Sequence, residues 1–117
     1  MSDKKAVSNK QAVTLSGKQV RHLRSLGHHL EPVVQLGKLG YTDQAQTAID
    51  EALTQHELVK IRIGTECPQD RKELATTVPD SLKASLAQAL GRTLLLYRKH
   101  PKKPVIKLPP SDAPVKG

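Results

Sequence analysis

The residues whose types and spacing best suit a chemical role form the short segment Gly37-Lys38-Leu39-Gly40. Residues 32–36, which precede it, are apolar and rich in β-branched side chains, a pattern that predicts a buried strand. After it, Thr42 is suited to cap a helix whose apolar residues recur at helical spacing over residues 45–53. Glycines allow a ligand to approach the backbone closely, and a helix start offers unpaired N–H donors and the positive end of its dipole. With Lys38 at its tip, this turn is suited to binding the phosphates of a nucleic acid.

The net charge of +8 is distributed unevenly along the chain. Residues 14–40 carry four basic side chains and one acidic one, whereas residues 41–91 carry five basic and eight acidic. Arg92 and Arg98 add two positive charges at the last expected strand. If the first helix, the glycine turn and the last strand meet in space, they form a basic face on an otherwise acidic body. The alternatives are a solvated surface with basic tails, and a glycine turn that only connects a strand to a helix.

The composition excludes several classes of protein. At 117 residues the chain has room for one domain with tails. Tyr41 and Tyr97 are its only aromatic residues, which argues against an RRM or cold-shock surface, since those stack bases on several rings. A single cysteine, Cys67, excludes an internal disulfide and a multi-cysteine zinc site. No stretch is long and apolar enough for a membrane span, and no secretory signal is evident, so we expect a cytoplasmic protein.

Catalysis has little support in the sequence. The Gly-Lys-Leu-Gly segment is too short for a P-loop, and its Gly-Lys pair lacks the Ser or Thr that follows directly in that motif. Three of the five histidines, His22, His28 and His29, do not have a common metal-ligand spacing. No nucleophile is paired with a recognisable base. We therefore expect the protein not to be an enzyme and to need no cofactor or metal.

Local signals predict the order of elements. Ser16 and Gln19 have the spacing of a capping box, so a helix should begin there and end at Gly27. The strand at 32–36, a helix over about 43–55 and a strand at 58–63 follow, and the last strand should cover residues 93–98. Residues 1–13 are expected to be a disordered basic tail, 14–98 the domain, and 99–117 an extended tail rich in proline and lysine rather than a packed element.

Several short segments, in this order and spacing, resemble one family. They are Leu15-Ser16 with Lys18-Gln19, His22-Leu23, Leu26-Gly27-His28, Pro32-Val33-Val34, Leu36-Gly37-Lys38-Leu39-Gly40 with Thr42, His56-Glu57-Leu58-Val59-Lys60, Gly91-Arg92-Thr93-Leu94 and Leu96-Tyr97-Arg98. Over residues 14–98 the chain resembles the bacterial CRM-domain proteins of the YhbY type, named for chloroplast RNA splicing and ribosome maturation.

The resemblance implies an α/β fold, a small mixed β-sheet packed with helices in the order α-β-α-β-α-β-β. This topology is similar to that of the C-terminal domain of translation initiation factor three. It also implies RNA binding through a Gly-x-x-Gly loop and association with precursors of the large ribosomal subunit. Because no stretch is long and apolar enough for a membrane span, we expect no membrane partner. Together with the charge pattern, the resemblance predicts RNA-binding residues in the loop, the first helix and the last strand: Gly37, Lys38, Leu39, Gly40, Lys18, Arg21, Arg24 and Arg92. We expect a monomer.

The chain departs from the family pattern at two places. Glu31 stands where family members often have a basic residue, which weakens that edge of the expected basic face. Residues 86–90 lack β-branched side chains, and local propensity alone extends a helix to Leu90. Following the family, we expect the third helix to stop near Lys83 and a strand to follow. The alternative function is a nonspecific nucleic-acid-binding or architectural protein.

Overall fold

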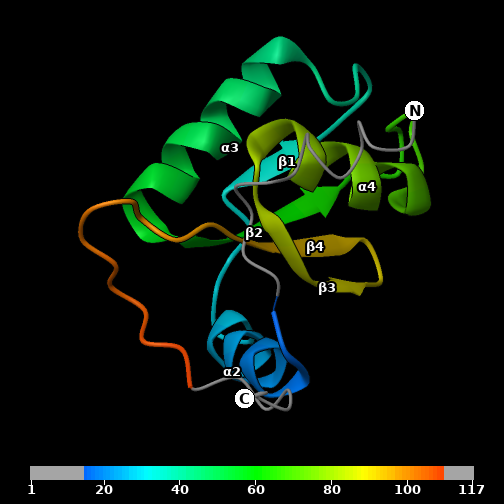
Figure 1. Ribbon diagram of the computed structural model, residues 1–117. Helices are drawn as coiled ribbons and strands as arrows, with labels where there is room; N and C mark the ends of the chain where they lie inside the picture. Colours follow the sequence, from blue (N-terminus) through cyan, green and yellow to red (C-terminus); the bar gives the residue numbers. More distant parts are fainter. Residues whose placement is uncertain (1–14, 110–117) are drawn as a thin grey trace, which may run out of the picture.

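The computed structural model describes residues 15–109, and the predicted tail at 1–13 lies outside this range. The elements are α2 (Gly17–Gly27), β1 (Val34–Leu36), α3 (Asp43–His56), β2 (Leu58–Ile63), α4 (Arg71–Leu82), β3 (Ser85–Leu90) and β4 (Thr93–Tyr97) (Figure 1). This is the predicted order α-β-α-β-α-β-β, so the expected fold class is confirmed. No helix within this range is long and apolar enough to cross a membrane.

The four strands form one mixed sheet in the order β1-β2-β4-β3. β1 runs parallel to β2, with Val34 opposite Ile61, whereas β2 and β3 both pair antiparallel with β4. The carboxyl ends of β1 and β2 therefore lie at the same end of the sheet as the turn between β3 and β4. The loop after β1, the loop after β2 and Arg92 meet there.

One face of the sheet carries the larger part of the core. α3 and α4 pack on this face, which lies above the sheet in Figure 1. The buried residues in this cluster come from β1, α3, β2, α4 and β4, together with Ala84: Leu36, Ile49, Leu53, Val59, Ile61, Ile63, Leu74, Val78, Leu82, Ala84, Leu94 and Leu96. The strict alternation of β2 places Val59, Ile61 and Ile63 in this core and turns Lys60 and Arg62 to the other face.

α2 covers only part of the opposite face. Leu23 packs there with Leu58, Leu95 and Tyr97 in a second, smaller cluster. At Gly27 the helix approaches β4 so closely that a Cβ atom would lie 2.6 Å from the Leu95 side chain. The helix begins with the predicted capping box, in which Ser16 accepts from Gln19 N–H and Gln19 accepts from Ser16 N–H.

The region that local propensity assigned to a helix is a strand. α4 runs through Pro79 and ends at Leu82, and Lys83 follows in the left-handed conformation with φ +54°. β3 then pairs with β4 along its whole length, with an irregularity in register between Leu86 and Gln88. The expectation that followed the family is thus confirmed, because pairing with a neighbouring strand outweighs the weak strand propensity of this segment.

The segment after β4 has no helix or strand over residues 99–109, yet it packs against the domain. Ile106 and Leu108 contact the smaller cluster, and Pro109 accepts a hydrogen bond from Gln19 Nε2 at 2.9 Å. In Figure 1 this segment, in orange, runs from the end of β4 down to α2. The expectation of an unpacked tail is therefore wrong for this part of the chain, and residues 110–117 lie outside the described range.

Glu57 holds this segment in place. It lies between α3 and β2 with φ +66° and is 1 % exposed. Its carboxylate accepts backbone N–H bonds from His100 at 2.7 Å, Val105 at 2.8 Å and Ile106 at 2.7 Å. Burial alone would raise the pKa of this carboxyl, but the three N–H donors and His100 lower it more, so the net pKa shift is downward.

Candidate nucleic-acid interface

The Gly37–Gly40 loop is a tight turn, and hydrogen bonds at Gly40 and Tyr41 fix its C-terminal end. Gly40 N–H donates to the Gly37 carbonyl at 2.8 Å, and Gly40 has φ +75°. The next residue, Tyr41, donates its N–H to Gln69 Oε1 at 3.0 Å, and its hydroxyl lies 2.7 Å from Ser81 Oγ. Burial raises the pKa of Tyr41, so this hydroxyl stays protonated at neutral pH.

The two glycines of the loop have different surroundings. A Cβ atom at Gly40 would collide with Gln69 Oε1 and lie 3.0 Å from Pro68 Cγ, so this glycine is required by the fold. A Cβ atom at Gly37 would have no neighbour within 4 Å, and Gly37 does not have a positive φ. Nothing in residues 15–109 therefore requires a glycine at position 37.

The tip of the loop is exposed and offers hydrogen-bond donors. Lys38 is exposed, and Leu39 is 82 % exposed. The backbone N–H groups of both residues make no hydrogen bond with another residue of the described chain. α3 begins directly after the loop, with Thr42 accepting from Ala45 N–H, and Asp43 in its first turn partly offsets the positive end of its dipole.

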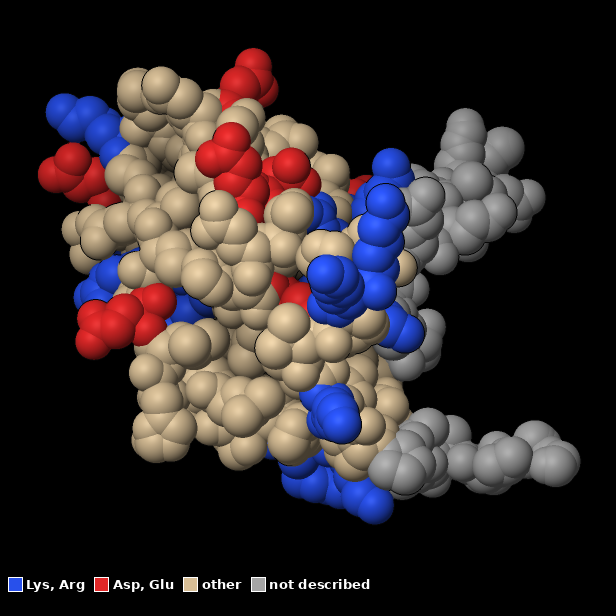
Figure 2. All heavy atoms as spheres, turned by 90° about the vertical axis from the view of Figure 1, so that its left-hand side faces the viewer, with Lys and Arg blue, Asp and Glu red and all other residues tan. Residues whose placement is uncertain are grey.

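The predicted basic helix lies apart from this loop. Lys18, Arg21 and Arg24 are all exposed on α2. In Figure 1, α2 lies at the bottom of the molecule, whereas the loop lies at the top beside the start of α3. Figure 2 shows acidic side chains over α3 near the top of the face drawn, and only basic ones at the bottom, where α2 lies. The basic side chains therefore do not form one patch around the loop.

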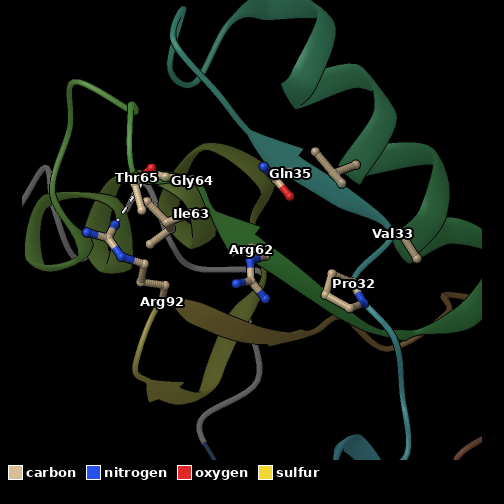
Figure 3. Close-up of a pocket in the computed structure, with 9 residues that line it drawn as sticks. Pro32, Val33, Gln35, Arg62, Ile63, Gly64, Thr65 and Arg92 are labelled. Atoms are coloured by element: carbon tan, nitrogen blue, oxygen red, sulfur yellow. Dashed lines mark hydrogen bonds between the residues drawn. The ribbon is translucent and has the colours of Figure 1, made fainter.

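Arg92 does lie at the loop end of the sheet. Its backbone carbonyl accepts from Ile63 N–H at 2.7 Å, and its guanidinium lies 3.4 Å from the Gly64 carbonyl oxygen (Figure 3). Gly64 in turn donates to the Leu36 carbonyl at 2.8 Å, directly before the loop. The structure thus brings Arg92 near the loop, across the end of β2.

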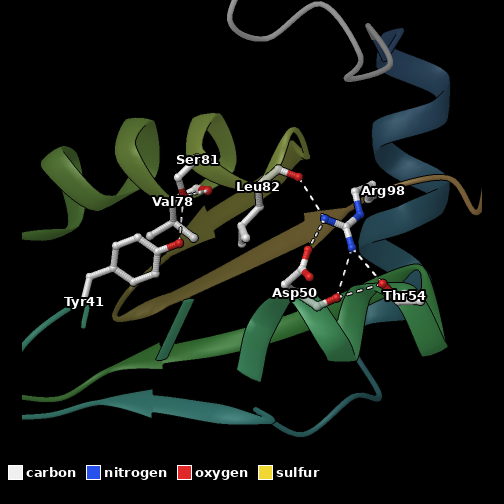
Figure 4. Close-up of polar contacts among 7 residues, drawn as sticks. All are labelled: Tyr41, Asp50, Thr54, Val78, Ser81, Leu82 and Arg98. Atoms are coloured by element: carbon white, nitrogen blue, oxygen red, sulfur yellow. Dashed lines mark hydrogen bonds and ion pairs between the residues drawn. The ribbon is translucent and has the colours of Figure 1, made fainter. Parts of the chain in front are cut away.

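Arg98 makes structural hydrogen bonds and does not extend the basic surface. Its guanidinium donates to Asp50 Oδ1 at 2.7 Å, to the Leu82 carbonyl at 2.9 Å and to Thr54 Oγ1 at 3.0 Å (Figure 4). It also donates to the Asp50 carbonyl at 3.0 Å. Arg98 therefore joins β4 to α3 and to the end of α4, and its charge is offset by that of Asp50.

Replacing Arg98 with alanine is expected to lower the free energy of unfolding by about 1–2 kcal/mol, because one partly buried side chain loses four hydrogen bonds. Urea denaturation measures this effect, with Lys99→Ala as the control because Lys99 is exposed and its side chain makes no such hydrogen bond within residues 15–109. Equal stability of the two variants would contradict this role.

Two basic residues on the sheet face that α2 partly covers were not among the predicted site residues. Lys60 and Arg62 project from β2 on the same face as α2, and Arg62 is exposed. The alternation of residues 58–63 already placed them opposite the core. The roles of Gln69 and Ser81 in fixing Tyr41 have no signal in the sequence. Within residues 15–109, no group of three His, Cys, Asp or Glu side chains could hold a metal ion.

Comparisons with known proteins agree with this architecture. The chain is 38 % identical over 95 residues to "Probable RNA-binding protein YqeI" of Bacillus subtilis, which covers 81 % of this chain and 99 % of that protein. It is also 38 % identical over 85 residues to "RNA-binding protein" of Haemophilus influenzae, covering 73 % of this chain and 86 % of the relative. The solution structure of a Staphylococcus aureus protein described as an RNA-binding candidate superposes with a TM-score of 0.70. That match has 36 % sequence identity and covers 82 % of this chain and 100 % of the other.

The sequence profile of the CRS1 / YhbY (CRM) domain matches residues 15–98, which span all seven helices and strands described above. The chain therefore belongs to the CRS1 / YhbY (CRM) domain family.

Proposed function

We propose that this protein binds RNA with the Gly37–Gly40 loop and acts without catalysis in the assembly of the large ribosomal subunit, as a cytoplasmic monomer. The loop would approach the RNA backbone, and the exposed lysines and arginines of α2 would contact phosphates farther along the same RNA. Few side chains at the loop could read base edges, so recognition would depend mainly on RNA shape and on single-stranded segments.

The observation that carries this proposal is the environment of Gly37. The fold leaves space for a side chain at this position, yet the residue is glycine. A glycine suits close approach of a phosphate oxygen when, as here, an exposed lysine and two backbone N–H groups without a partner in residues 15–109 lie beside it. The relatives named as RNA-binding proteins support RNA as the ligand.

Replacing Gly37 with Asp and Lys38 with Glu is expected to weaken RNA binding at least about tenfold, because two negative charges would face the phosphates. Both positions are open to solvent, so the double variant should fold and melt like the wild type. Fluorescence anisotropy with ribosomal RNA fragments measures the affinity. The control is Lys72→Glu, which changes an exposed lysine on α4 without touching the loop. Equal losses in both variants would indicate nonspecific electrostatic binding instead.

Sedimentation of cell lysates in sucrose gradients tests the assembly role. The wild type is expected to migrate with precursors of the large subunit, and the folded double variant at Gly37 and Lys38 is expected to remain at the top. If both proteins remain at the top, the proposal that this protein associates with ribosomal precursors is wrong. If both migrate with the precursors, the loop is only a connection and other basic residues bind the RNA.

A further inference from the structure

An open groove lies at the loop end of the sheet, on the part of the α2 face that the helix leaves uncovered. Its volume is about 680 Å³ (Figure 3). Segments from β1, the end of β2 and the turn before β4 line it: Pro32, Val33, Val34, Gln35, Arg62, Ile63, Gly64, Thr65 and Arg92. The lining contains two cations and no carboxylate, so its chemistry favours an anion.

Arg62 is the central cation of this groove. Its backbone lies opposite Gln35 on β1 and Thr93 on β4, so its two cross-strand neighbours on this face are uncharged. Its exposed guanidinium makes no hydrogen bond or ion pair with residues 15–109. The fold therefore places five N–H donors on the surface without using any of them.

Arg92 and two polar side chains complete the donors. One nitrogen of Arg92 contacts the Gly64 carbonyl only weakly, at 3.4 Å, so its guanidinium keeps further donors for a ligand. In Figure 3 Arg62 lies below Gln35 near the end of β2, and Arg92 lies beyond that end with its guanidinium turned towards Gly64. Two guanidinium groups and an amide at one groove suit the oxygens of a phosphodiester.

The opposite wall of the groove is apolar. Pro32 lies beside Arg62 in Figure 3, and the side chain of Val33 is 49 % exposed although valine is usually buried. An apolar wall facing arginines can hold a base between an aliphatic surface and a guanidinium plane. An unpaired nucleotide offers both parts, a negative phosphate and a flat base, whereas a base-paired one keeps its base in the duplex.

The geometry points to a second RNA site in this groove, which takes an unpaired nucleotide of the strand held by the Gly37–Gly40 loop. Arg62 and Arg92 bind its phosphate, and Pro32 and Val33 contact its base or ribose. This inference rests on the proposed RNA binding, but it assigns a different surface from the loop. The groove also lies on the same face of the sheet as α2, so it gives the RNA a route from the loop towards Lys18, Arg21 and Arg24.

Anisotropy titrations with an oligouridylate of about ten nucleotides, at several KCl concentrations, test the second site. The double variant Arg62→Gln with Arg92→Gln is expected to bind about tenfold more weakly and to lose about one unit of the slope of log affinity against log salt. Arg62→Gln alone removes no contact within residues 15–109 and is expected to lose about threefold. Lys72→Gln on α4 is the control and should bind like the wild type. Backbone amide shifts of Gln35, Arg62 and Thr65 on titration would locate the ligand.

The outcomes separate the second site from the loop. If the wild type binds and both arginine variants bind equally well, the groove is not a site, and the loop proposal stands. If the arginine variants lose affinity but the Gly37 and Lys38 double variant does not, the groove binds RNA and the loop proposal is wrong. If the wild type binds no RNA, both proposals are wrong.

Discussion

Replacing Glu57 with alanine is expected to lower the free energy of unfolding by about 3 kcal/mol. The carboxylate is buried and accepts N–H bonds from three residues of one segment, His100, Val105 and Ile106. Hydrogen bonds to a charged acceptor contribute about 1.5–3 kcal/mol each, but the released segment regains bonds to water, which limits the total loss. Urea denaturation measures the loss, and amide hydrogen exchange at residues 105–106 should show that this segment has become accessible.

Glu57→Gln is the matched variant, because it keeps an acceptor for Val105 and Ile106 but turns a donor towards His100 N–H. It should lose less than Glu57→Ala. An alanine variant as stable as the wild type would contradict the idea that this carboxylate holds the C-terminal segment.

The same carboxylate makes stability depend on pH. Because folding lowers the pKa of Glu57, its contribution is fully present above the ordinary pKa of a glutamate and is lost as the pH falls through the lower, folded value. The difference in melting temperature between the wild type and Glu57→Gln should therefore shrink on acidification across that range. A constant difference would mean that Glu57 does not titrate with a lowered pKa.

Replacing Gly40 with alanine is expected to destabilise the domain by about 2–3 kcal/mol. A left-handed conformation costs a non-glycine residue roughly 1–2 kcal/mol, and φ at Gly40 is +75°. The new methyl group would also displace Gln69 Oε1, which accepts the Tyr41 N–H bond, and would press on Pro68. Thermal and urea unfolding measure the cost.

Gly37→Ala is the control for Gly40→Ala, because the same change at the other end of the loop meets open space. It should leave stability within about 0.5 kcal/mol of the wild type. If the two alanine variants are equally stable, the assignment of a structural role to Gly40 alone is wrong.

Much of the fold could be predicted because its signals are local. The capping box at Ser16, the alternation over 58–63 and the spacing after Thr42 each act within a few residues, and each element is present. The strand at Ser85–Leu90 has no such local signal, since its pairing with β4 decides its conformation. Only the resemblance to a family supplied it.

The candidate site was harder to predict because it depends on contacts between distant residues. The sequence could not show that Arg98 is bound by Asp50 and Leu82, or that Glu57 binds a segment more than forty residues away. Nor could it separate the two glycines of the loop, whose roles differ because Gly40 alone has a positive φ and lies against Gln69 and Pro68. The predicted RNA contacts of the loop, α2 and Arg92 stay predictions.

The strand order β1-β2-β4-β3 has a consequence for how the chain is made. The last strand within residues 15–109, β4, occupies an interior position of the sheet, between β2 and β3. While the protein is being synthesised, β2 and β3 therefore have no common partner until residues 93–97 have left the ribosome. The N-terminal elements cannot complete the sheet ahead of the rest, so the domain should fold in one late step. Chains arrested before β4 should instead expose two unpaired strand edges and require chaperones.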